Sequence, residues 1–176
     1  FIVTTNVRWV INAPILYSYG FDKYQTTITA WTGIERTEYL LAAKQIRDYF
    51  NNTDDTLDVR ITQRGILKSI YNNREISHMK DVKRLIKGVY LTQLLTGSYL
   101  LAFMVLAIVL ERRKSLARIG LGLSIGSSVT IGLIILTGIG TLAGFDNLFH
   151  TFHLVSFTND LWMLDPNQDN LIAMFP

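Results

Sequence analysis

One stretch decides the fold: residues 119–143 read IGLGLSIGSSVTIGLIILTGIGTLA, 25 in a row without a formal charge. Residues 88–110 form a second such run of 23. At a rise of about 1.5 Å per residue, either run as a helix crosses a hydrocarbon core roughly 30 Å thick. Charged residues make up 18% of the 176 residues, below the roughly 25% of soluble domains. The sequence therefore predicts an α-helical integral membrane protein with two complete spans.

The composition excludes several classes of function. The formal net charge is +3 and the basic residues flank the apolar runs, which favours contact with lipid head groups over nucleic acid. The chain has no cysteine, so neither a disulfide framework nor a thiolate nucleophile is available. No G-x-S-x-G motif is present, and Ser156 stands in no recognisable nucleophile setting. We interpret Ser156 as structural.

The loop between the two runs predicts the orientation. Residues 111–118 read ERRKSLAR, with four basic side chains in eight residues, and a short basic loop favours the cytoplasm. The other flank of the first run, residues 80–87, is also basic, whereas residues 144–147 after the second run carry no basic side chain. We therefore place the loop inside the cell and the opposite ends of both spans, with all three histidines, outside.

The N-terminal part predicts a membrane exit followed by a small cap. Residues 1–13 are expected to be the end of a first transmembrane helix, with Arg8 and Trp9 at the interface; the alternative is an amphipathic strand. Residues 14–73 are too few for a large core of their own. They predict a small mixed α/β extracellular cap.

Within this cap, three patterns predict elements. Residues 25–31, QTTITAW, have β-branched character and predict a strand. A helix is expected from about residue 33 to residue 50, because its apolar residues recur near helical spacing. Residues 56–62 alternate apolar and polar side chains, which predicts a strand with one buried face and a partner strand at 65–71.

Residues 74–110 are expected to form one helix that leads into and completes the first full span. Asn72 or Asn73 is a good N-cap for it. His78 lies on one face of this helix with Glu75, Val82, Leu85 and Ile86, at offsets of three, four, seven and eight. Glu75 and Asp81 lie three residues to either side of His78, so either carboxylate could orient the imidazole, or both could belong to a solvated face.

The last segment, residues 144–176, is rich in aromatic and titratable side chains and is expected to be an extracellular site segment. His150 and His153 share a helical face and, with His78, could ligate zinc, although the spacing is not H-E-x-x-H. Two histidines from separate segments can instead divide acid and base work, because imidazole titrates near neutral pH. A third interpretation is interfacial histidines bonded to the backbone.

Other residues of this segment also leave alternatives open. Asp165 and Asn167 flank Pro166, which predicts a turn whose side chains cap their own backbone. Trp162 and the phenylalanines around it, including Phe149, could form a membrane-interface belt or the wall of an acyl-lined pocket.

Three separated motifs resemble one family. They are NVRWVINAPILYSYGFDKY at 6–24, NREISHMKDVKRL at 73–85 and FHTFHLVSFTNDLWMLDPNQDNLIAMFP at 149–176. These motifs are similar to the signature of the bacterial lipoprotein intramolecular transacylases. The resemblance implies four membrane helices under an extracellular cap, so that the first helix is truncated here and a fourth, after Pro176, is missing.

The resemblance also implies the site. The histidine of the E-x-x-H-M motif falls on His78 and that of the F-H-x-x-F run falls on His150, so both are expected to be catalytic. His153 occupies a position that is more often aromatic, and no catalytic role is carried onto it. We expect six further residues to bind substrate or support the histidines: Glu75, Asp81, Phe149, Asn159, Trp162 and Asp165.

The implied reaction moves an acyl chain from the sn-2 oxygen of a diacylglyceryl-cysteine to the α-amino group of that cysteine, giving a lyso-form lipoprotein. The expected partners are a diacylglyceryl-modified lipoprotein and membrane lipid, with no nucleic acid, no metal and no cofactor. The expected location is the bacterial cell membrane, multi-pass, with the site on the extracellular face. Two alternatives stay open, a zinc-dependent membrane hydrolase and a non-catalytic membrane protein whose cap binds a partner. A transporter is disfavoured because neither full span carries an ionisable residue at mid-depth.

Overall fold

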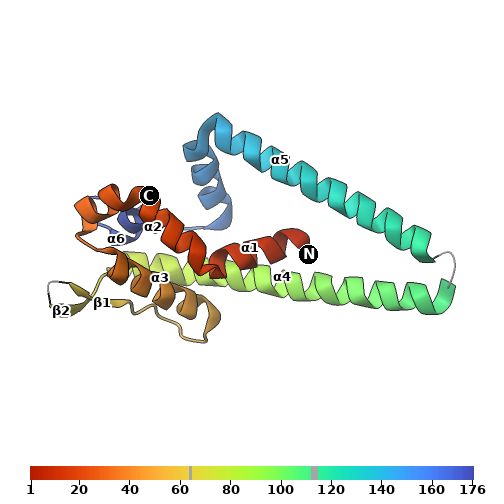
Figure 1. The fold of residues 1–176 in the computed structure, drawn as a ribbon, viewed down its shortest axis with the longest axis horizontal. Coiled ribbons are helices and arrows are strands. Elements are labelled where there is room, and N and C mark those ends of the chain that lie inside the picture. The colour runs from red at the N-terminus through yellow and green to blue at the C-terminus, as the bar shows by residue number, and fades with distance from the viewer. Residues whose placement is uncertain (64, 112–114) are drawn as a thin grey trace. The chain divides into compact units, whose positions relative to one another are not determined.

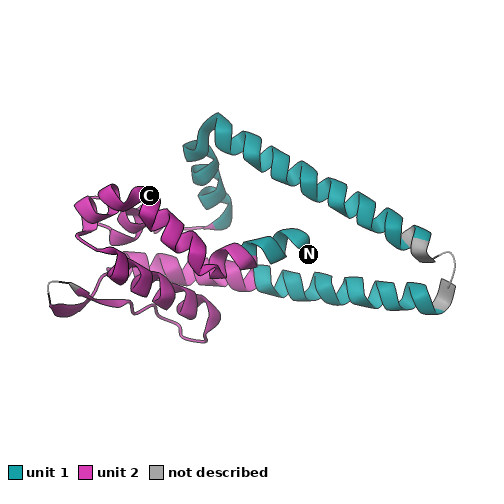
Figure 2. Cartoon of the chain, viewed as in Figure 1, with its two compact units in different colours: residues 1–7, 89–156 teal, residues 8–88, 157–176 magenta. Residues whose placement is uncertain are grey.

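The structure is a computed structural model that describes residues 1–63, 65–111 and 115–176, and it is mainly helical (Figure 1). Six helices and one hairpin are described, in the order α1 (Ile2–Asn12), α2 (Pro14–Thr32), α3 (Arg36–Asn51), β1 (Arg60–Gln63), β2 (Ile66–Ser69), α4 (Asn73–Glu111), α5 (Ser115–Ser156) and α6 (Asn170–Met174). The chain forms two compact units, which Figure 2 shows in different colours. Unit 1 contains residues 1–7 and 89–156, and unit 2 contains residues 8–88 and 157–176.

Unit 1 consists mostly of the apolar parts of α4 and α5. In the described part of the chain, these two helices are long and apolar enough to cross a membrane. Their large aliphatic side chains are exposed, for example Leu94 at 65% and Leu136 at 67%. Apolar side chains over this length face lipid when no protein covers them. The prediction of a helical membrane protein is confirmed.

The first residues of unit 1 are helical. Gln93 Nε2 on α4 donates a hydrogen bond of 3.0 Å to Thr5 Oγ1 on α1. A Cβ added to Gly97 would lie 3.0 Å from the Phe1 ring, so a glycine lets the two helices approach closely there. The alternative of an amphipathic strand over residues 1–13 is therefore wrong.

The helix α5 bends at Gly144, which has φ 159° and ψ 91° inside an otherwise helical run. Side-chain-bearing residues rarely adopt this combination, and a Cβ there would lie 3.4 Å from Asn147 Nδ2. The bend separates the apolar run 119–143 from the aromatic end that carries His150. Of the predicted cytoplasmic loop 111–118, residues 112–114 lie outside the described residues.

Unit 2 has its own core, built where α2 packs on α3 and α6. The side chains of Phe21, Ile28 and Tyr39 are at most 2% exposed. The Tyr39 ring lies 5.0 Å from the Phe21 ring and 5.4 Å from the Phe175 ring, so this aromatic cluster joins α2, α3 and the residue after α6. Burying such large rings contributes most of the stabilisation of a small core.

The strand predicted at residues 25–31 is wrong, because these residues form the second half of α2. Phe21 and Ile28, seven residues apart, are both fully buried, which is the repeat of two helical turns. Tertiary packing of this face overrides the β-branched propensity of the segment. The helix is kinked at Tyr24, just before this segment, where φ is −114° and ψ is 18°.

The hairpin was predicted at the right place but is shorter than expected. Strands β1 and β2 pair antiparallel, with Ile61 opposite Lys68 and Gln63 opposite Ile66. Leu57, Val59 and Ile61 are buried as the alternation predicted. Gln45 on α3 also holds β1 in place, because it bonds both backbone groups of Arg60, with N–O distances of 2.9 and 3.0 Å.

Candidate functional site on the α4 turn that carries His78

The site is built on the first turns of α4, whose start the sequence signals clearly. Asn72 Oδ1 accepts hydrogen bonds from the backbone N–H groups of Arg74 and Glu75, at 2.9 and 3.1 Å. Glu75 Oε2 accepts one in return from the Asn72 N–H, at 2.7 Å. This reciprocal pair is a capping box. It fixes the helix one turn before His78, and the prediction of Asn72 as N-cap is confirmed.

Glu75 has a second role that joins distant parts of the chain. Its side chain is 0% exposed, and its Oε1 accepts a hydrogen bond of 2.6 Å from the Leu171 N–H, at the start of α6. Beside it, Asn72 Nδ2 donates to Asp169 Oδ1 at 2.7 Å. The carboxylate of Glu75 therefore holds the ends of two helices together.

We call residues 157–176, which follow α5, the strap. The strap is tied to α4 on both sides of His78. Arg74 Nη2 donates a hydrogen bond of 2.8 Å to the Asp160 carbonyl oxygen. Asn159 Nδ2 donates one of 2.8 Å to Asp81 Oδ2.

His78 itself lies between α4 and the strap. Its side chain is 6% exposed. The ring of Phe157 stands edge-on to the imidazole, with 5.2 Å between centroids and 71° between planes. An aromatic ring in this geometry limits how the imidazole can turn.

The rest of the strap is held by its own turn and by burial. Trp162 is 7% exposed. Asp165 Oδ1 accepts hydrogen bonds of 2.9 Å from the backbone N–H and from the side-chain amide of Asn167. The backbone bond has the larger effect and the side-chain bond adds to it, and together they lower the pKa of the Asp165 carboxyl below its usual value. The predicted turn at Pro166 is confirmed.

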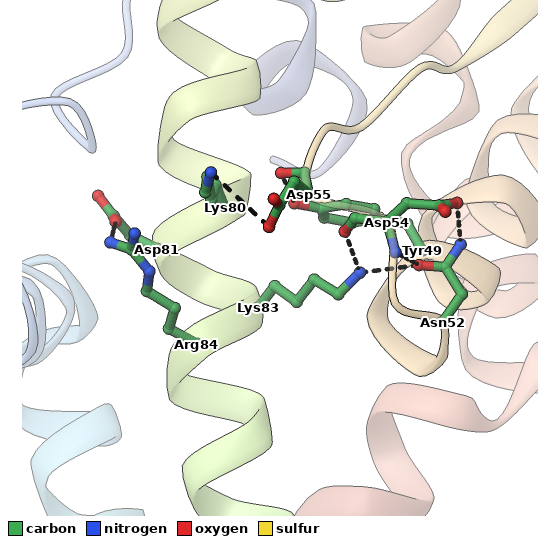
Figure 3. A network of polar contacts seen from close by, with 8 residues as sticks. All are labelled: Tyr49, Asn52, Asp54, Asp55, Lys80, Asp81, Lys83 and Arg84. Carbon is green, nitrogen blue, oxygen red and sulfur yellow. Dashed lines mark hydrogen bonds and ion pairs between the residues drawn. The ribbon is translucent and has the colours of Figure 1, made fainter.

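A second polar network continues from α4 into the cap (Figure 3). Lys83 Nζ donates hydrogen bonds of 2.8 Å to Asn52 Oδ1 and 2.7 Å to the Asp54 carbonyl oxygen. It also lies 3.9 Å from the centroid of the Tyr49 ring. Lys83 is 4% exposed. These three partners compensate for the burial of its ammonium group. It fastens the end of α3 to α4.

The other two histidines belong to unit 1, on the aromatic end of α5. His153 Nδ1 lies 2.7 Å from the Phe149 carbonyl oxygen one turn earlier. The rings of Phe149 and His153 are 4.0 Å apart between centroids. The bond to the backbone agrees with the interpretation of His153 as a structural residue.

The structure thus distributes the predicted site residues over its two units. Unit 2 brings His78 together with Glu75, Asp81, Asn159, Trp162 and Asp165, whereas Phe149, His150 and His153 share one end of α5 in unit 1. Among the described residues there is no group of three or more His, Asp or Glu side chains that could hold a metal ion.

Sequence reasoning missed the roles of Phe157, Asp169 and Lys83. The capping box was readable, since Asn and Glu three residues apart precede an apolar run. The contacts of Phe157, Asp169 and Lys83 join segments 29 to 97 residues apart, and no local pattern signals such contacts.

Comparison with solved structures shows where this fold occurs. The lipoprotein intramolecular transacylase Lit from Bacillus cereus, a membrane-integral protein, has a TM-score of 0.76 at 20% identity over 98% of this chain and 74% of its own. A variant of that protein in which a histidine is replaced by alanine has a TM-score of 0.67 at 19% identity, over 98% and 72%. Comparison with curated protein sequences gives no significant match.

Comparison of the sequence with protein families identifies the family of this chain. A family model described as lipoprotein intramolecular transacylase Lit matches residues 1–176. The match covers both units, including the strap and the capping box of α4. This chain therefore belongs to the Lit family of lipoprotein intramolecular transacylases and is a membrane acyltransferase that acts on lipoproteins.

Proposed function

We propose that this enzyme moves an acyl chain from the sn-2 oxygen of the diacylglyceryl-cysteine of a lipoprotein to the α-amino group of that cysteine, with His78 and His150 as the acid and base. One observation carries the assignment of the site. His78 is packed against Phe157, and Phe157 directly follows α5, seven residues after His150 along the chain.

The reaction needs an acid and a base, and two imidazole groups of the chain can supply them. The α-amine has a pKa near 8, so a neutral imidazole can take its proton while the nitrogen attacks the ester carbonyl. As the carbon–nitrogen bond forms and the carbon–oxygen bond to glycerol breaks, a protonated imidazole gives its proton to the departing glyceryl oxygen. Each such proton transfer contributes about 10²- to 10⁴-fold in rate.

Positioning supplies another large share of the rate. Nucleophile and ester belong to one molecule, and well-oriented intramolecular reactions reach effective molarities of about 10⁵ to 10⁸ M. The protein then needs no nucleophile of its own, which agrees with a chain that has no cysteine. The enzyme has to hold the two groups in register and move protons.

We also propose that the enzyme is a multi-pass protein of the bacterial cell membrane with its site on the extracellular face. The support is the short basic sequence 111–118 between the two apolar helices. The diacylglyceryl group of a lipoprotein lies in the membrane, and His78 stands on α4 ten residues before its apolar run 88–110, which suits this substrate.

A crossover experiment tests the transfer. Full-length enzyme is given two diacylglyceryl lipopeptides that differ in peptide mass, one of them with deuterated acyl chains, and the products are read by mass spectrometry. We expect each peptide to gain only its own chain on the α-amine. Exchange of label between the peptides would contradict intramolecular transfer.

The same assay decides between this proposal and a zinc-dependent hydrolase. We expect transfer to persist in the presence of a strong chelator, with no free fatty acid formed. Loss of activity on chelation, restored by zinc, would favour the hydrolase.

A further inference from the structure

We propose that Asp81 and Asn159 form a positioning pair for His78, whose hydrogen bond keeps Phe157 against the imidazole ring. The inference rests on the proposed function, in which His78 moves a proton. It assigns to Asp81 and Asn159 a defined task that is neither proton transfer nor substrate contact.

The hydrogen bond between Asn159 and Asp81 is partly shielded from solvent. Asn159 Nδ2 donates to Asp81 Oδ2 at 2.8 Å, while Arg84 Nη1 donates to the other oxygen, Oδ1, at 3.0 Å (Figure 3). The Asp81 side chain is 18% exposed and that of Arg84 is 71% exposed. Because the arginine is well solvated, its ion pair contributes little, and the bond to Asn159 is the one that fixes the carboxylate.

Asn159 is held rigidly on the strap side. Its Oδ1 accepts a hydrogen bond of 3.0 Å from the Leu161 N–H, which closes a local turn. The next residue, Asp160, receives the bond of 2.8 Å from Arg74. The turn is therefore tied to α4 four residues before His78 and again three residues after it.

Phe157 lies two residues before Asn159, so the tie at Asp81 determines how closely its ring can approach α4. The ring now stands edge-on to His78 at 5.2 Å between centroids. Without the tie, the start of the strap can shift and the imidazole gains rotational freedom. A displacement of about 1 Å in a catalytic arrangement lowers the rate by roughly 10²-fold.

An exchange of the two side chains gives a sharp test. Asn159→Asp puts a second carboxylate at hydrogen-bond distance from Asp81 and breaks the pair by repulsion. Adding Asp81→Asn restores an amide–carboxylate bond in the opposite direction, and the Leu161 N–H keeps its acceptor. We expect the single variant to lower kcat by about 10- to 100-fold with KM changed less than about threefold. The double variant should return most of the lost kcat.

A spectroscopic measurement separates positioning from simple loss of structure. Full-length enzyme with isotope-labelled histidine gives ring signals by NMR, and the signal of His78 is identified with His78→Gln. The ring of Phe157 shifts this signal, so we expect it to move in Asn159→Asp and to return in the exchanged variant. If Asn159→Asp does not fold, Asn159→Ala, which removes the donor to Asp81 and the acceptor of the Leu161 N–H, takes its place, and we expect a lower kcat and a shifted His78 signal.

Asp48→Asn is the matched control, since it removes one partner of an exposed ion pair with Lys44 and should leave both kcat and the His78 signal unchanged. A double variant as slow as the single one, or a slow single variant with an unmoved His78 signal, would overturn the inference. Full activity of His78→Ala would instead refute the proposed function, and the His78 signal would still test the pair.

Discussion

At the scale of single residues, the buried carboxylate of Glu75 is the strongest structural feature near the site. It accepts backbone hydrogen bonds of 2.7 and 2.6 Å from Asn72 and Leu171. Both of its oxygens are therefore engaged in holding the starts of α4 and α6. We assign it to the architecture of the site and not to proton transfer.

This assignment predicts the effect of Glu75→Gln. The new amide group has one oxygen, so its NH₂ faces one of the two backbone donors and leaves it unsatisfied. We expect the free energy of unfolding to fall by about 1–3 kcal/mol, measured by thermal unfolding in detergent. The control is Asp22→Asn, which removes an exposed ion pair with Arg36 and should change the melting temperature little. An unchanged melting temperature in Glu75→Gln would contradict this structural role of the Glu75 carboxylate.

The lowered pKa of Asp165 predicts that the stability of the folded protein depends on pH. Hydrogen bonds from Asn167 lower its pKa in the folded protein, so the folded state favours the ionised form more than the unfolded state does. The stabilisation is present above about pH 4 and is lost as the pH falls through the lowered pKa. We expect Asp165→Asn to melt below the parent at pH 6 and to match it near pH 2. A difference that persists at pH 2 would refute this account.

At the scale of elements, α2 shows how local and tertiary signals compete. Gly33, which follows the last residue of α2 as its C-cap, has φ 64° and donates its N–H to the Thr29 carbonyl oxygen at 2.9 Å. This is a left-handed helix cap, which glycine adopts without steric penalty. Gly20 lies inside the same helix, and a Cβ there would find its nearest neighbour, Tyr39 Oη, at 3.9 Å.

The two glycines of α2 therefore predict opposite effects of alanine. Gly33→Ala places a Cβ in the left-handed region and should destabilise the protein by about 1–2 kcal/mol. Gly20→Ala adds a methyl group at ordinary contact distance in a helix interior and should stabilise it by about 0.5–1 kcal/mol. Thermal unfolding of both variants checks the signs. If both variants change the stability in the same direction, the assignment of Gly33 as the left-handed C-cap of α2 is wrong.

At the scale of the whole molecule, much of the fold followed from the sequence. The uncharged lengths of 88–110 and 119–143 predict two spanning helices, and α4 and α5 contain them. The N-cap at Asn72 and the hairpin face of Leu57 and Val59 were also readable, because each depends on neighbours along the chain.

The rest of the fold and site depends on contacts between distant segments. The helical state of residues 25–31 is decided by packing of α2 on α3, and local propensity indicates the opposite. The engagement of Glu75 by Leu171 and of Asp81 by Asn159 joins residues 96 and 78 positions apart. The sequence identified Glu75, Asp81 and Asn159 as candidate site residues, but it did not show which residues they contact.

The proposed orientation predicts a labelling pattern. Residues 1–176 contain no cysteine, so a single cysteine introduced among them is the one thiol of this segment. We expect a membrane-impermeant maleimide added to intact cells to label Thr53→Cys in the cap and not Ala117→Cys in the basic sequence 111–118. After the cells are opened, both should react. The reverse pattern in intact cells would place the site inside the cell.

The central claim is that His78 and His150 of this chain drive the acyl transfer. The most direct test is mass spectrometry of the N-terminal peptide of a diacylated lipoprotein, from one host that expresses either the full-length protein or its His78→Ala, His150→Ala double variant at equal levels. The account predicts an acyl chain on the α-amine only with the unaltered protein, and both chains on glycerol with the variant. Transfer that continues in the variant, or none with the well-expressed unaltered protein, would contradict it.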